Sequence, residues 1–180
     1  MMVFPSSIRI PVRNHLTGRT CYLVRGDEVS RTNECLSGIV AICNEPAIYK
    51  GLFARLLAGQ PYTMNMAVEW LAWAEEGWRN NTRFCFMTLD VRGDVVAACD
   101  IKSAEVDGAE VGYWTSSSHR GVMTNTVATV IQLAANAGFR SLMARAQHAN
   151  FRSKRVMERV GFLPDPARRD ESHDYFLLSL

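Results

Sequence analysis

Hydrophobic and polar residues are spaced in the first half of the chain in a way that predicts a helical region. Residues 1–19 carry scattered prolines and polar groups and are expected to form an irregular lead-in or an edge hairpin, followed by a strand over Cys21–Arg25. Three helical segments are then predicted. The first is capped by Asp27 and continues through Leu36, Ile39, Val40 and Cys43, and the second has apolar positions at Ile48, Leu52, Phe53, Leu56 and Leu57 before Gly59. The third begins at Pro61 and places Met66, Trp70, Trp73 and Gly77 on one stripe.

The second half is predicted to form most of a sheet. A meander of three strands is expected over Phe84–Leu89, Val95–Ile101 and Glu110–Thr115, followed by a helix from near Met123 to Gly138, a strand over Leu142–Ala146, a short helix from Asn150 to Gly161, a strand beginning at Phe162 and a last strand over Asp174–Leu180. A strand, helix and strand in succession imply a right-handed crossover between parallel neighbours. The fold class is therefore α/β (α+β), as one mixed sheet in a single domain over 1–180.

Composition excludes several classes of protein. The 180 residues are 48% apolar and 21% charged with a formal charge of +2, which is typical of a globular domain, and no long run of Lys or Arg indicates a nucleic-acid partner. No run of about 18 apolar residues predicts a membrane span, so a soluble cytoplasmic protein is expected. The five cysteines are odd in number and lack metal-ligand spacing, as do the four histidines, so reduced thiols and no metal site are expected.

One short segment, Ser118–Thr124, has the character of a phosphate-binding turn. It is basic, contains Gly121 and lies between a predicted strand and a predicted helix, where free N–H groups and the helix dipole favour an anion. Arg120 is the candidate phosphate ligand, although an arginine in a loop is equally explained as a solvated charge. The segment therefore raises a hypothesis that needs support from other motifs.

That support comes from a resemblance. The run Glu110–Trp114, then His119–Gly121, then Asn150 and Ser153 leading into Gly161 and Phe162, and the closing strand over Asp174–Leu180 together resemble the GNAT superfamily of acyl-CoA-dependent N-acyltransferases. The branch most similar is that of the ribosomal-protein N-terminal acetyltransferases. The resemblance covers roughly 20–180, and it implies a mostly antiparallel sheet in which a central parallel strand pair splays apart.

The resemblance also implies a site for acetyl-CoA, used as a cosubstrate. The pantetheine arm would bind the backbone of the strand ending at 113–116, and the pyrophosphate would bind N–H groups of the following loop. The implied cofactor-binding residues are Trp114, Thr115, Arg120, Gly121, Val122, Met123, Thr124, Asn150 and Ser153. Asn150 is equally explained as a helix cap with no ligand.

Two catalytic residues are implied in the same way. Glu110 would accept a proton from the substrate ammonium, directly or through water, because only a neutral amine attacks the thioester. Ser153 would return a proton to the departing CoA thiolate. The plainer interpretations are that Glu110 is the exposed start of a strand and that Ser153 merely occupies the first turn of a helix.

The loop departs from the family pattern, which has two small residues in a fixed spacing after the initial Arg or Gln. Without a gap, Met123 and Asn125 stand at those two positions. The preferred alignment introduces a gap, so that 122–124 form the first helical turn and the loop is about two residues short. Either alignment predicts weakened cofactor binding.

Three hypotheses follow. The first is an N-acetyltransferase that passes acetyl from acetyl-CoA directly to a primary amine, either a protein N-terminus or a small molecule. The second is a degenerate GNAT-fold binding or regulatory module, and the third is an unrelated nucleotide-binding α/β protein. The acceptor groove is expected between Phe53–Trp78, where Trp73 and Trp78 could form its rim, and Pro164–Tyr175. The oligomeric state is open, with a homodimer among the alternatives.

Overall fold

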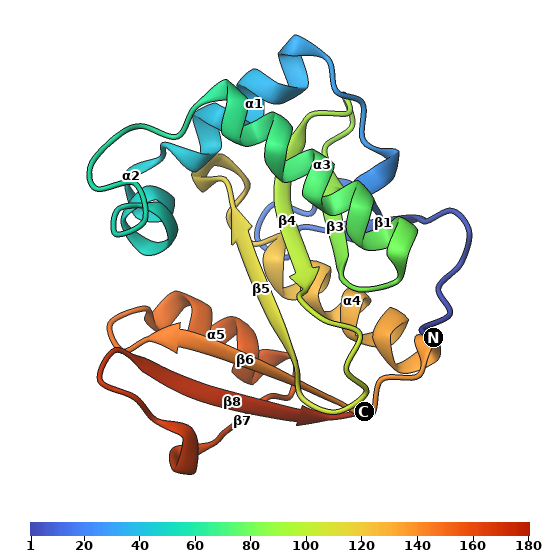
Figure 1. The fold of residues 1–180 in the computed structure, drawn as a ribbon, viewed down its shortest axis with the longest axis vertical. Coiled ribbons are helices and arrows are strands. Elements are labelled where there is room, and N and C mark those ends of the chain that lie inside the picture. Colours follow the sequence, from blue (N-terminus) through green and yellow to red (C-terminus); the bar gives the residue numbers. More distant parts are fainter.

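The computed structural model describes residues 1–180 and contains one eight-stranded sheet with helices on both faces (Figure 1). The strands are β1 (Arg9–Arg13), β2 (Thr20–Arg25), β3 (Phe84–Leu89), β4 (Val95–Ile101), β5 (Ala109–Thr115), β6 (Ser141–Gln147), β7 (Leu163–Pro164) and β8 (His173–Ser179). Their order is β1-β2-β3-β4-β5-β6-β8-β7, and β5 with β6 is the one parallel pair. The expected mixed, mostly antiparallel sheet with a central parallel pair is confirmed.

The helices are α1 (Asn33–Cys43), α2 (Pro46–Ile48), α3 (Met64–Asn80), α4 (Met123–Ala137) and α5 (Phe151–Arg159), and a π-helical turn over Tyr49–Phe53 follows α2 directly. Helices α1 and α3 pack together against β3 and β4, whereas α4 and α5 contact each other on the opposite face. A hydrophobic cluster lies on each face of the sheet, the larger under α4 and α5. None of these helices combines the length and apolar character needed to cross a lipid bilayer.

Of the two alternatives for residues 1–19, the structure shows the edge hairpin: Arg9–Arg13 pairs with β2, and Ile8 and Val12 are buried. Pro11 is tolerated there because an edge strand needs no hydrogen bond on its outer side. Asp27 does not cap α1: its carboxylate binds Arg25, and the Thr32 hydroxyl instead accepts from the Cys35 amide at 3.3 Å.

The expected second helix is also broken into pieces. Pro46 begins α2, and after three residues the chain changes to the π-helical turn that contains Gly51. Glycine is a poor helix former, and the wider turn ends at Phe53 rather than continuing to Leu57. The remaining element predictions agree with the structure to within a few residues, and the five cysteines are unpaired, four of them buried.

Candidate functional site

A cavity lies where β5 and β6 separate. The two strands pair only over Ala109–Val111 and Leu142–Ala144, and Figure 1 shows them diverging beyond this point. The diverging halves keep their other neighbours, β4 and β8, but no longer satisfy each other's backbone groups. The cavity between them has a volume of about 520 Å³, and α2 with its π-helical turn covers one side. An extended ligand with amide groups could therefore pair with both strand edges.

The loop between β5 and α4 forms one end of the cavity. Helix α4 begins at Met123, and the amides of Gly121, Met123, Thr124 and Asn125 donate to no protein acceptor. Gly121 has φ +101°, a backbone conformation that side chains other than glycine rarely adopt. Four free N–H groups at the start of a 15-residue helix, beside the basic Arg120, form a site suited to an anion.

In the ungapped alignment, Met123 and Asn125 stand at the two positions where the family pattern has small residues, and their side chains make contacts outside the loop. Met123 is 4% exposed and packs into the larger core cluster, although it also borders the cavity. The Asn125 side chain donates to the Arg13 carbonyl oxygen at 2.6 Å. The core therefore accommodates the Met123 side chain, and the β1–β2 hairpin accommodates the Asn125 side chain.

Helix α5 supplies the opposite edge of the cavity. The Asn150 side chain caps this helix by accepting from the Ser153 amide at 3.2 Å, and both residues border the cavity. Arg152 also borders it, and neither Arg152 nor Arg120 forms an ion pair. Two unpaired cations thus flank the cavity from opposite edges, one of which, Arg152, the sequence reasoning missed. Its position beside the capping Asn150 was the available signal.

A pair of hydroxyl groups joins β5 to α5 inside the cavity. The Tyr113 hydroxyl lies 2.8 Å from Ser153 Oγ and donates to the Ser153 carbonyl oxygen at 3.0 Å. Burial raises the pKa of Tyr113, more than the Ser153 hydrogen bond lowers it, so the phenol stays protonated at neutral pH. Tyr113 therefore hydrogen-bonds directly to Ser153, the residue that the resemblance implies as proton donor.

Glu110 borders the cavity on β5 but is not free. Its Oε1 accepts from Lys102 Nζ at 2.5 Å and from Arg145 Nε at 3.2 Å, and only 21% of its side chain is exposed. Burial alone would raise its pKa, but the hydrogen bond and charge of Lys102, with the charge of Arg145, outweigh burial and lower the pKa. Glu110 is therefore a weak proton acceptor held between two cations.

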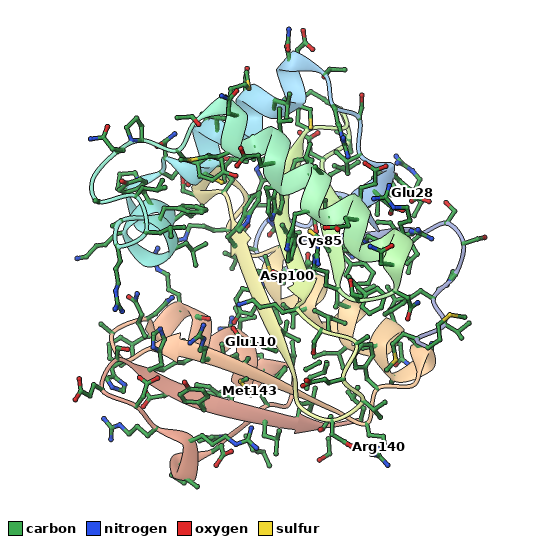
Figure 2. All side chains as sticks on the ribbon, in the orientation of Figure 1. Glu28, Cys85, Asp100, Glu110, Arg140 and Met143 are labelled. Carbon is green, nitrogen blue, oxygen red and sulfur yellow. The ribbon has the colours of Figure 1, made fainter.

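A second carboxylate lies on the neighbouring strand. Asp100 on β4 is opposite Gly112 on β5, and its Oδ1 is 3.1 Å from the position that a Gly112 side chain would occupy. Figure 2 shows Asp100 and Glu110 on adjacent strands, close to the start of the separation between β5 and β6. Burial raises the pKa of Asp100 to about 6, although the charge of Lys102 opposes this. Sequence reasoning missed Asp100, whose signal was a lone acid within an apolar strand.

A further contact ties the N-terminal helices to the loop. Glu45, between α1 and α2, accepts from the Ser116 hydroxyl at 2.9 Å and from the Ser117 amide at 2.7 Å. Glu45 borders the cavity, so its contacts fix the cavity wall formed by α2 relative to the end of β5. Nothing in the local sequence marked this residue.

The structure brings together most of the residues predicted for the site. Those that border the cavity are Glu110, Trp114, Thr115, Arg120, Met123, Asn150 and Ser153, whereas Gly121, Val122 and Thr124 do not. Trp73 and Trp78 do not form a rim: Trp78 is buried and donates to the Cys85 carbonyl oxygen, and Trp73 lies beneath the Arg83 guanidinium. The cavity is covered instead by Ala47–Leu52 and by His173 from the last strand.

Comparisons with known proteins place this geometry in a family. A family model described as an acetyltransferase (GNAT) domain matches residues 32–163. A search of curated proteins finds no match.

Several solved structures have the same fold. RimJ of Mycobacterium smegmatis, solved with CoA-disulfide, is 15% identical with a TM-score of 0.75, covering 97% of this chain and 88% of that chain. RimL, a ribosomal L7/L12 alpha-N-protein acetyltransferase solved with coenzyme A, is 11% identical with a TM-score of 0.73, covering 95% and 98%. Spermidine N-acetyltransferase of Vibrio cholerae, solved with CoA and spermine, is 12% identical with a TM-score of 0.65, covering 88% and 95%. Since the family model spans well over half of the sequence, the chain belongs to the GNAT acetyltransferase family.

Proposed function

We propose that this protein transfers an acetyl group from acetyl-CoA directly to a primary amine. The observation that carries the proposal is the cavity between the separated strands, which is bordered by the unpaired Arg120 and Arg152 and by Met123, one of the four residues with free amides at the start of α4. The phosphates of CoA suit these groups, and the amides of its pantetheine arm suit the strand edges that no neighbour satisfies. The CoA-bound structures of RimJ and RimL, which share the fold, support this assignment.

The acceptor nitrogen must lose a proton before it attacks the thioester. Glu110 is the candidate for receiving it, directly or through a water molecule, since it borders the cavity next to the strand separation. Its lowered pKa keeps it ionised throughout the neutral range, so the pH dependence of turnover should follow deprotonation of the amine. Asp100 has a pKa of about 6, nearer to neutrality, but it does not border the cavity, so Glu110 is the proposed base.

The departing CoA thiolate must gain a proton or a stabilising hydrogen bond. Ser153 Oγ and the Tyr113 hydroxyl form a connected pair on the face of the sheet opposite Glu110, and both border the cavity. The serine would donate to the sulfur while the tyrosine phenol, protonated at neutral pH, keeps the serine oriented. Acid and base groups on opposite sides of β5 suit direct transfer, in which amine and thiol occupy the cavity together.

The acceptor class is a primary amine on either a protein N-terminus or a small molecule. RimJ and RimL represent the first kind of acetyltransferase, and the spermidine enzyme represents the second. The cavity wall formed by Ala47–Leu52 and by His173 of the last strand is the candidate contact surface for either kind of acceptor.

Binding of acetyl-CoA provides the first test. A ligand that binds only the native state increases the free energy of unfolding by about RT ln(1 + [L]/Kd) and thereby raises the melting temperature. A millimolar excess of acetyl-CoA should therefore raise the melting temperature clearly, whereas ATP at equal concentration should raise it less. An unchanged melting temperature would support the degenerate module instead. Where a shift is seen, release of CoA thiol with a panel of N-terminal peptides and polyamines identifies the acceptor.

A further inference from the structure

The β1–β2 hairpin packs directly against the phosphate-binding loop, although it lies outside the residues that the family model matches. Asn14, at the start of the hairpin turn, is 2% exposed, and its side chain uses its whole hydrogen-bonding capacity. Nδ2 donates to the carbonyl oxygens of His119 at 3.4 Å and Arg120 at 3.0 Å. Oδ1 accepts from the amides of Leu16 at 2.9 Å and Thr17 at 3.1 Å.

The next residue continues the same contact. The His15 amide donates to the Gly121 carbonyl oxygen at 3.1 Å, so three successive carbonyl groups of the loop, at 119–121, are bound by the hairpin. In a planar trans peptide the carbonyl of one residue and the N–H of the next point in opposite directions. Holding the carbonyl groups of His119 and Arg120 against the hairpin therefore turns the N–H groups of Arg120 and Gly121 away from it.

Gly121 is fitted closely into this arrangement. A Cβ at this position would lie 2.5 Å from Asn14 Oδ1 and 2.7 Å from Leu16 Cγ. The close approach explains why the loop has a glycine at position 121, where any side chain would clash with the hairpin. The family's usual small residues are absent from the helix side, where Met123 is anchored in the core.

We propose that Asn14 is a positioning residue that presets the β5–α4 loop for the pyrophosphate of CoA by binding its carbonyl groups and leaving its amides free. This inference rests on the proposed function, because the proposed function identifies the anion bound by those amides as the pyrophosphate of CoA. Preorganisation reduces the ordering cost of binding, and here a buried hydrogen-bond network supplies it in place of additional glycines.

The decisive variants are Asn14→Ala and Asn14→Asp. The aspartate keeps an oxygen to accept from the Leu16 and Thr17 amides, so the hairpin turn is retained, but it lacks both donors to the loop carbonyl groups. Val12→Ala is the matched control, because it weakens packing of the same hairpin without removing any of the hairpin's hydrogen bonds to the loop. Dissociation constants for CoA are measured by calorimetry. KM and kcat are measured with acetyl-CoA and with S-acetyl-pantetheine, which lacks the pyrophosphate.

Both Asn14 variants should weaken CoA binding and raise KM for acetyl-CoA by about tenfold, with kcat nearly unchanged and with no change in kinetics on S-acetyl-pantetheine. Val12→Ala should lower the melting temperature without this selective loss. If Asn14→Ala is recovered unfolded, Asn14→Asp decides the question. Wild-type affinity for CoA in the Asn14 variants, or an equal loss with both thioesters, would overturn the positioning role. Failure of the wild-type protein to bind CoA would instead reject the proposed function.

Discussion

Replacing Asp100 with asparagine should stabilise the folded protein at neutral and alkaline pH. Asp100 is opposite Gly112 in the middle of the sheet, where burial raises its pKa from the ordinary value of 3.8 to about 6. An aspartate whose pKa is raised by folding binds its proton more tightly in the native state than in the unfolded state. Its ionisation therefore opposes folding, and asparagine removes the charge while keeping the size of the side chain.

The sign and the pH window follow from the two pKa values. Below about pH 3.8 the carboxyl is protonated in both states and contributes no difference, whereas above about pH 6 it is ionised in both and the full cost applies. A shift of roughly two units at about 1.4 kcal/mol per unit corresponds to about 3 kcal/mol. For a domain of this size, that free energy raises the melting temperature by about 5–10 °C.

Thermal unfolding of both proteins between about pH 4 and pH 8 measures the effect. The difference in melting temperature between Asp100→Asn and wild type should be small at the acidic end and should grow through about pH 6. Asp94→Asn, on an exposed turn and paired with Arg92, is the control and should change the free energy of unfolding by less than about 0.5 kcal/mol. A destabilised Asp100→Asn at about pH 8, or a difference independent of pH, would refute this reasoning.

Three further experiments test the site. Glu110→Gln should slow turnover by about 100-fold without altering the melting-temperature shift caused by acetyl-CoA, and unchanged turnover would remove Glu110 from the mechanism. Ser153→Ala should lower kcat by about tenfold or more, whereas Tyr113→Phe should lower it less; the reverse order would make the tyrosine the proton donor. Gly121→Ala should destabilise the protein by about 1–3 kcal/mol and weaken CoA binding, because the added Cβ is strained at φ +101° and also clashes with Asn14. Gly138→Ala is the control, because Gly138 has a similar φ of +106° but no neighbour within 4 Å, so this variant measures the backbone strain without the clash. Equal CoA affinity in the two glycine variants would contradict the role given to the loop.

The sheet was predictable because its strands have simple apolar patterns and are separated by short turns. Phe84–Leu89 and Val95–Ile101 occupy the predicted positions, and the crossover from β5 through α4 to β6 required their parallel pairing. The N-terminal region was less predictable because competing local interactions decide it. Asp27 has the sequence character of a helix cap, but Arg25 binds its carboxylate, and the helix begins later at Asn33 with Thr32 as its cap.

The residues of the site were partly predictable for a similar reason. Arg120, Asn150 and Ser153 belong to local motifs, and the structure places all three at the cavity. Asp100 and Asn14 act through contacts with residues far away in the sequence, Asn14 reaching a loop more than one hundred positions later. Such contacts depend on strand register and hairpin docking, which no local spacing reveals.

The proposed reaction passes acetyl from acetyl-CoA directly to a primary amine. Mass spectrometry of a reaction containing isotopically labelled acetyl-CoA and the acceptor panel tests it most directly, with the intact protein measured in the same samples. Direct transfer predicts labelled acetyl on the amine of at least one acceptor, formation of that product about 100-fold more slowly in Glu110→Gln, and an unmodified protein when acetyl-CoA is present alone. Absence of labelled amine throughout the panel despite tight CoA binding, or a labelled acetyl-protein that forms first and then passes its label to the amine, would contradict it.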